Sequence, residues 1–166
     1  MWKAILGCVV LAVMFNLQAA APDIGEIPEN HLGATLDGKD VLLENYQGKV
    51  VVISFWASWC APCLKELPVL NSIQQDVGQD LMQVIAVNHK EDRKRYRRLH
   101  KVMSESLTSL VFTHDQRGRI GDAYGVEALP TLYVIDKTGK VAYHKVGFGE
   151  SSIDSIVDIL NVELVK

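Results

Sequence analysis

The chain has 166 residues, of which 48% are hydrophobic and 22% are charged, with 12 Gly and 5 Pro. This length fits one globular domain with a short appended segment. A composition this apolar excludes a largely disordered or low-complexity chain. The formal net charge of -3 argues against a general nucleic-acid binder, whose signature is a strongly basic domain. Three cysteines are too few for a disulfide-rich scaffold.

The first 21 residues have the order of a targeting segment. Lys3 provides a basic start, an apolar run follows from Ala4 to Leu17, and alanines occupy positions 19–21. This order is typical of a secretory signal peptide. The apolar segment also reaches the lower limit of a membrane span, about 17 residues, so a retained membrane anchor stays open. We expect residues 1–21 to be a signal peptide or anchor, and residues 22–166 to form one domain exported to the periplasm.

The hydrophobic pattern of the remaining chain alternates between strands and helices. Short apolar runs rich in β-branched residues predict buried strands, and apolar residues three or four apart predict helices. In chain order we expect a hairpin over 36–41 turning at Asp37-Gly38, a strand over 50–55, a helix over 62–76 kinked at Pro68, a strand over 81–87, a charged helix over 91–103, a strand over 110–113, a helical turn over 118–124, a hairpin of strands 131–135 and 140–146, and a C-terminal helix from Ser152 whose capping box pairs Ser151 with Asp154. This order predicts an α/β domain with a mixed, mostly parallel sheet flanked by helices.

The sequence Cys60-Ala61-Pro62-Cys63 lies directly after a predicted strand and opens a predicted helix. A helix start presents unpaired backbone N–H groups and the positive end of the helix dipole, which together stabilise an anion. We therefore expect the pKa of the Cys60 thiol to fall below its ordinary value of about 8.5, so that Cys60 is the attacking thiolate. Cys63, one helical turn later, would resolve the mixed disulfide. Pro62 suits the first helical turn because no backbone N–H is needed there.

Two other interpretations of this cysteine pair are weaker. A zinc site needs four ligands, and the sequence has neither a second cysteine pair nor histidines at ligand spacing, so we expect no metal and no other cofactor. A purely structural disulfide would close too small a loop to stabilise the fold by much. Once residues 1–21 are removed, Cys60 and Cys63 are the remaining cysteines, and in an oxidising compartment they either form one disulfide or cycle through it.

Three stretches carry a further signal: Gly48 to Pro68 around the cysteines, Ala123 to Thr131, and Ile135 to Lys140. In these residues the chain resembles the thioredoxin superfamily. Within it, the chain is similar to the TlpA/ResA/CcmG branch of exported, often membrane-tethered bacterial thiol–disulfide oxidoreductases. The resemblance covers about residues 24–164 and implies a thioredoxin-like fold with an N-terminal β-hairpin. It also implies a helix inserted between the second and third core strands.

The resemblance implies roles for residues beyond the two cysteines. Pro130 matches the cis-proline that the family packs against its C-x-x-C motif, which would expose the Leu129 backbone to a substrate strand. Glu66 matches a carboxylate three residues after the second cysteine, close enough to handle the proton of Cys63. A solvated helix glutamate is the alternative interpretation of Glu66. Trp59 precedes the first cysteine, where it would shield the sulfur and frame the docking surface together with Pro62.

One position departs from the superfamily pattern. Many thioredoxins carry a buried aspartate six residues before the first cysteine, and Ser54 takes that place here. A serine cannot accept a proton at neutral pH, so proton handling would fall to Glu66 or to water. Trp56, in the same predicted strand region, is expected to belong to the core.

The predicted helix over 91–103 is strongly basic inside an acidic chain. Tyr96, Leu99 and Met103 are expected to form its buried stripe, which leaves the arginines in water. A solvated helix face is the simplest interpretation. A docking face for an acidic partner, or for an anionic membrane surface, stays open as the alternative.

These observations and the resemblance imply an exported enzyme that reduces disulfides of periplasmic protein substrates through a Cys60–Cys63 cycle. The resemblance further implies a membrane thiol transporter as electron donor, and we expect no nucleic acid among the partners. Three substrate classes are compatible with these observations. They are the cysteines of apocytochromes, which would mean a role in cytochrome c biogenesis, a disulfide isomerase, and periplasmic proteins in general. The alternatives are an oxidant or isomerase of the same fold, and a non-catalytic binding module with an inert disulfide. A thiol peroxidase is disfavoured, because Ala57 stands where peroxiredoxins need Thr or Ser.

Overall fold

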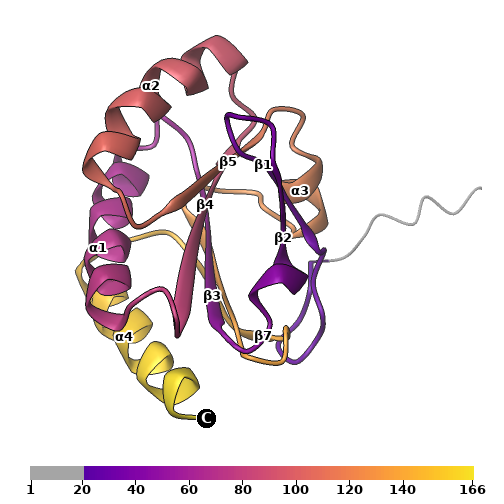
Figure 1. Ribbon diagram of the computed structural model, residues 1–166, viewed down its shortest axis with the longest axis vertical. Coiled ribbons are helices and arrows are strands. Elements are labelled where there is room, and N and C mark those ends of the chain that lie inside the picture. Colours follow the sequence, from indigo (N-terminus) through magenta and orange to yellow (C-terminus); the bar gives the residue numbers. More distant parts are fainter. Residues whose placement is uncertain (1–20) are drawn as a thin grey trace, which may run out of the picture.

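The structure, a computed structural model, describes residues 21–166, so the signal peptide or anchor expected over 1–21 lies outside it apart from Ala21. Strands and helices alternate along most of the described chain (Figure 1). They are β1 (His31–Ala34), β2 (Asp40–Leu42), the 3-10 helix η1 (Leu43–Tyr46), β3 (Val50–Trp56), α1 (Ala61–Val77), β4 (Met82–His89), α2 (Arg93–Ser106), β5 (Val111–Asp115), α3 (Arg119–Ala123), β6 (Thr131–Ile135), β7 (Val141–Val146) and α4 (Glu150–Val165). None of the helices within residues 21–166 has both the length and the apolar character that crossing a bilayer requires.

The strands form one mixed sheet in the order β2-β1-β5-β4-β3-β6-β7. Parallel pairing is confined to β3 with β4 and β4 with β5, whereas the other pairs are antiparallel. The α/β class and the mixed sheet are confirmed, but the expectation of a mostly parallel sheet was wrong. The reason is that tight hairpins at both ends of the sheet make antiparallel pairs, and β6 adds to β3 in the antiparallel direction.

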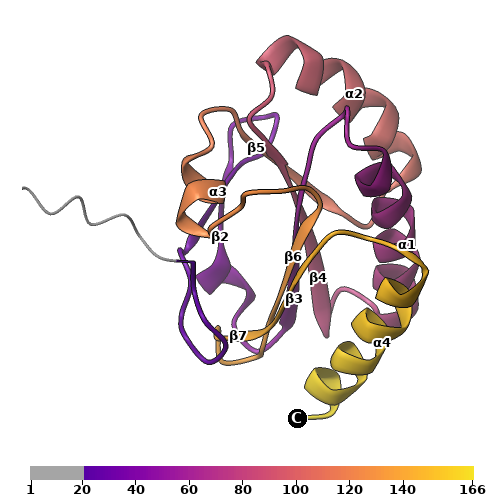
Figure 2. The same ribbon diagram turned by 180° about the vertical axis from the view of Figure 1, so that it is seen from behind.

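Helices cover the two faces of the sheet unequally. Figures 1 and 2 show α1, α2 and α4 on one side of the sheet and α3 on the other. Every residue of β3 and of β4 is buried, as expected for central strands that are covered on both faces. Trp56 belongs to the apolar cluster under α1, α2 and α4, as predicted, whereas Phe55 belongs to the cluster on the opposite face.

The helices lie where the sequence predicts them, but their first and last residues differ from the predicted ones. α1 continues through Pro68 as one helix. α2 lies between β4 and β5, where the inserted helix was expected, and Asp92 caps it by accepting hydrogen bonds from the backbone N–H groups of Lys94 and Arg95. The Ser151–Asp154 capping box was wrong, because α4 begins earlier, at Glu150.

The start of α4 is fixed by a different serine. Ser152 is buried, and its hydroxyl accepts a hydrogen bond of 2.9 Å from the backbone N–H of Gly149. The backbone N–H of Ser152 in turn donates to the Gly149 carbonyl, also at 2.9 Å. The buried side of the first turn therefore selects Ser152 as the capping partner, while Asp154 points to solvent.

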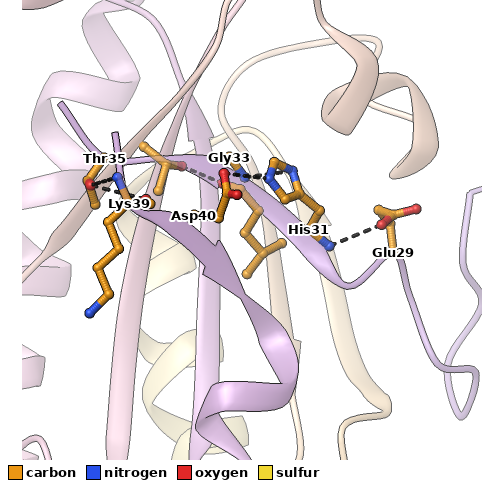
Figure 3. A network of polar contacts seen from close by, with 8 residues as sticks. Glu29, His31, Gly33, Thr35, Lys39 and Asp40 are labelled. Atoms are coloured by element: carbon orange, nitrogen blue, oxygen red, sulfur yellow. Dashed lines mark hydrogen bonds and ion pairs between the residues drawn. The ribbon is translucent and has the colours of Figure 1, made fainter. Parts of the chain in front are cut away.

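Local polar contacts hold the N-terminal hairpin of β1 and β2 (Figure 3). The backbone N–H of Gly33 lies 3.4 Å from His31 Nδ1, and His31 Nε2 lies 3.2 Å from Asp40 Oδ1. Because Nδ1 accepts, Nε2 carries the proton and donates to Asp40. Across the turn, Thr35 Oγ1 donates to the Lys39 carbonyl and accepts from the Lys39 N–H. The hairpin was expected over 36–41, but its first strand, β1, begins earlier, at His31.

Candidate active site

Residues distant in the sequence meet at one edge of the sheet. β3 and β4 run parallel with Trp56 opposite Asn88, so the loops that follow them lie side by side. β6 runs antiparallel to β3 with Thr131 opposite Phe55, so the residue before β6 returns to the same edge. The register therefore brings the Cys60 loop, the β4–α2 connection and Pro130 together.

The two cysteines form a disulfide at the amino end of α1. The S–S distance is 2.03 Å and the two Cα atoms lie 5.3 Å apart. Cys60 is the residue that caps α1, and its Sγ accepts a hydrogen bond of 3.2 Å from the backbone N–H of Cys63. Cys60 keeps 4% of its surface exposed, whereas Cys63 is fully buried. The sulfur that a partner reaches first is therefore that of Cys60.

The first turn of α1 leaves the positive end of its dipole uncompensated. Its residues after Cys60 include no acidic side chain, and Pro62 occupies the turn without removing a needed donor. The backbone N–H of Cys60 donates to the Ala57 carbonyl at 3.1 Å, which fixes the turn that leads into the helix. A negative charge that develops on Cys60 Sγ would thus face backbone N–H groups with no competing carboxylate in that turn.

Glu66 is buried on the same helix, three residues after Cys63. It keeps 1% of its surface exposed, so the alternative of a solvated helix glutamate was wrong. The Ser54 hydroxyl donates a hydrogen bond of 2.6 Å to Glu66 Oε1. Burial raises the pKa of Glu66 to about 7, while the Ser54 hydrogen bond and the positive charge of Lys145 act in the opposite direction. Ser54 cannot accept a proton itself, but it holds a carboxyl that can.

A second buried carboxylate fixes the loop before Cys60. Glu91 is 5% exposed and accepts hydrogen bonds from the Ser58 backbone N–H at 2.8 Å, from the Ser58 hydroxyl, and from Asn88 Nδ2 at 2.6 Å. These contacts tie the cysteine loop to the connection between β4 and α2. Sequence reasoning missed this role and treated Glu91 as part of the charged helix, because a contact across 33 positions leaves no local pattern.

The Leu129–Pro130 peptide bond is cis, as the family resemblance implied. Pro130 is buried, and its carbonyl accepts a hydrogen bond of 2.7 Å from the Gly147 backbone N–H. Trp59 stands out from the surface with 63% of its area exposed. One groove beside the cysteine loop is lined by Trp59, His89, Lys90, Val126, Glu127, Ala128 and Leu129. The roles of Trp59, Pro62, Leu129 and Pro130 in substrate binding stay predictions.

A second groove adjoins the first turn of α1. It is lined by Ala61, Pro62, Lys65, Phe148, Gly149, Glu150 and Ile153. The disulfide loop therefore lies between two hollows on the surface, one toward the cis-proline loop and one toward α4. The sequence indicated the cysteines and the proline, but not that Phe148 and Ile153 would reach the same place.

His89, which lines the groove at Trp59, forms a buried pair with Asp115. His89 Nδ1 lies 3.1 Å from Asp115 Oδ2, and the backbone N–H of Gly121 donates to the same oxygen at 2.9 Å. Burial alone would raise the pKa of Asp115, but the hydrogen bonds from His89 and Gly121 lower it. Within residues 21–166 no three His, Cys, Asp or Glu side chains are grouped so as to hold a metal ion.

Comparisons with known proteins agree with this geometry. Residues 18–160 match the Redoxin family. The thiol-disulfide oxidoreductase ResA of Geobacillus thermodenitrificans is 30% identical over 138 residues, which are 83% of this chain and 77% of that protein. A Chlorobium tepidum structure, assigned as a thiol:disulfide interchange protein DsbE, superposes with a TM-score of 0.76 at 30% identity and covers 87% of this chain and 99% of its own.

A third relative is the exposed lipoprotein thioredoxin Etrx1 of Streptococcus pneumoniae. Its structure has a TM-score of 0.65 at 32% identity, over 78% of this chain and 96% of that one. The thioredoxin-like fold and the resemblance to the ResA and CcmG branch are confirmed. The chain therefore belongs to the Redoxin family, and with its Cys60–Cys63 pair it is a thiol–disulfide oxidoreductase of the ResA and DsbE type.

Proposed function

We propose that this chain is an exported disulfide reductase that passes two electrons from the Cys60–Cys63 dithiol to disulfides of periplasmic proteins. The observation that carries the proposal is the placement of the two sulfurs. Cys60 caps α1 and keeps 4% of its surface exposed, whereas Cys63 is fully buried. This placement separates an attacking sulfur from a resolving one.

The cycle follows from that separation. The Cys60 thiolate attacks one sulfur of a substrate disulfide, which breaks the substrate S–S bond, forms a mixed disulfide and releases one substrate thiolate. Cys63 then attacks Cys60 Sγ, which breaks the mixed disulfide and releases the second substrate thiolate. The substrate gains two electrons, and the chain ends as the Cys60–Cys63 disulfide seen in the structure.

Glu66 supports the second step as the proton acceptor. Cys63 must lose its proton before it attacks, and the buried sulfur has little access to water. Glu66 lies one helical turn from Cys63 on α1, and its pKa of about 7 allows the carboxyl to take up and return a proton near neutral pH. Ser54 keeps that carboxyl in place through its hydrogen bond.

The reducing direction and the exported location rest on the resemblance and on the N-terminal sequence. Residues 1–21 would direct the chain out of the cytoplasm as a signal peptide or keep it tethered to the inner membrane. The pneumococcal relative, an exposed lipoprotein thioredoxin, supports export. An oxidising compartment would leave the pair oxidised, so a reductase there needs an electron donor, for which we propose a membrane thiol transporter.

The reduction potential of the Cys60–Cys63 pair tests the direction. We expect a value between about -220 and -280 mV, near those of glutaredoxins and thioredoxin, because a reductant must hold its electrons weakly. Equilibration with a glutathione or dithiothreitol series, followed by alkylation of the free thiols, measures it. A value near about -120 mV would instead mark an oxidant. A value below about -300 mV, combined with no thiol exchange, would mark an inert disulfide.

Replacement of the resolving cysteine tests the substrate class. In the Cys63→Ala variant the mixed disulfide on Cys60 cannot be resolved, so exported substrates should accumulate as covalent adducts that reducing agent releases. Mass spectrometry of the adducts identifies them, and partners rich in C-x-x-C-H would indicate cytochrome maturation. The Cys60→Ala variant is the matched control and should trap far less. Equal adducts in both variants, or none in either, would count against the proposed cycle.

Replacement of Glu66 tests its raised pKa. The folded carboxyl has a pKa of about 7 against an ordinary value of 4.5, so the folded state holds a proton that the unfolded state has lost between these pH values. The stability of the oxidised wild type should therefore fall relative to Glu66→Gln by roughly 3 kcal/mol as the pH rises from 4 to 8. Denaturant unfolding at several pH values measures this difference. A difference that does not change with pH would show an ordinary glutamate.

A further inference from the structure

The basic residues of α2 gather on one exposed face. All are exposed to solvent and recur at helical spacing; Lys94, Arg98 and Lys101 lie opposite the buried Tyr96, and Arg93 and Arg97 lie at the border of that side. We call this the basic face, and it consists of Arg93, Lys94, Arg97, Arg98 and Lys101. No acidic residue interrupts it between Arg93 and Lys101, although the chain as a whole carries 20 acidic against 17 basic residues. The basic face therefore carries a charge opposite in sign to the net charge of the chain.

Helix stability does not explain the basic face. Arg93 and Arg97, Arg97 and Lys101, and Lys94 and Arg98 are like charges four residues apart, which disfavours a helix. Cations in the first turns also lie at the positive end of the helix dipole. Among the described residues, the ion pairs of α2 are limited to Arg95 with Glu91, and Arg95 is not part of the basic face. An anionic ligand would offset these repulsions, whereas solvent leaves them in place.

The basic face begins just after a residue that binds the loop before Cys60. Glu91 binds the Ser58 backbone two residues before Cys60, and Asp92 caps the helix immediately afterwards. The first turn of α2 is therefore fixed against the cysteine loop. From Arg93 to Lys101 the helix rises by about 12 Å, which matches roughly four residues of extended polypeptide. A chain that presents its disulfide to Cys60 could lay a short flanking segment along these charges.

We propose that the basic face of α2 binds acidic residues flanking the disulfide of the protein substrate. This inference rests on the proposed function, because it names the substrates of the same site. The attraction would raise the rate of encounter and orient the substrate before sulfur exchange. A polypeptide fits better than a membrane surface, because membrane-surface helices insert an apolar face into lipid, and Tyr96, Leu99 and Met103 of α2 already pack against the sheet.

Three disulfide peptides of equal length and cysteine spacing test this surface with the reduced full-length chain. Their flanking residues are acidic, basic or neutral, and the second-order rate of exchange is measured at low and at high salt. We expect the acidic peptide to react about tenfold faster than the basic one at low salt, and high salt to abolish the difference. Arg97→Gln with Arg98→Gln should lower the ratio of acidic to neutral rates toward one, without loss of thermal stability.

The matched control removes two exposed lysines away from α2. Lys39→Gln with Lys140→Gln changes the net charge equally and should leave the ratio of acidic to neutral rates as in the wild type. An equal fall in both double variants would show an effect of net charge alone and overturn the basic face as a binding surface. The same conclusion follows if the arginine variant loses binding to anionic vesicles while its peptide rates stay unchanged.

The same peptides distinguish a failure of the basic face from a failure of the proposed reductase function. A wild-type chain that reacts equally with all three peptides remains a reductase and overturns the basic face alone. A wild-type chain that reacts with none of them overturns the reductase proposal, and the role of the basic face falls with it.

Discussion

The chemistry of this chain depends on a sulfur atom held at the amino end of a helix. Cys60 caps α1 and accepts the Cys63 N–H, so the backbone that starts the helix is also the group that stabilises charge on the sulfur. The position is set by β3, a fully buried strand whose end places the turn at Ala57 against the sheet edge. The antiparallel register of β6 then returns Pro130 to the same edge. Redox function and fold are thus fixed by the same few backbone contacts.

Two buried carboxylates near this sulfur, Glu91 and Glu66, differ in how many hydrogen bonds they accept. Glu91 is satisfied by donors from Ser58 and Asn88, and such a fully bonded group positions a loop. Glu66 receives one hydrogen bond, from Ser54, and burial raises its pKa to about 7. Desolvation in the core disfavours ionisation of this carboxyl, so it can hold a proton near neutral pH. The contrast between Glu66 and Glu91 supports our proposal that Glu66 handles a proton, whereas Glu91 positions the loop.

The sequence predicted the elements whose signals are local. The apolar run at β3, the helical spacing of α1 and the C-x-x-C between them define the site, and the resemblance added the cis bond at Pro130. The sequence did not predict contacts between distant positions. The Ser54–Glu66 hydrogen bond depends on how α1 packs over β3, and the Glu91–Ser58 contact depends on strand order. The cap of α4 was wrong because burial, rather than spacing, selects Ser152 over Ser151.

The helix start at Cys60 should make its sulfur a thiolate near neutral pH. Titration of the reduced Cys63→Ala variant, followed by thiolate absorbance and by the rate of alkylation, measures the pKa of the Cys60 thiol without interference from the second cysteine. We expect this pKa to lie at least one unit below the ordinary value of about 8.5. A Cys60 thiol that titrates at or above about 8.5 would contradict it, because the helix start would then give the sulfur no stabilisation.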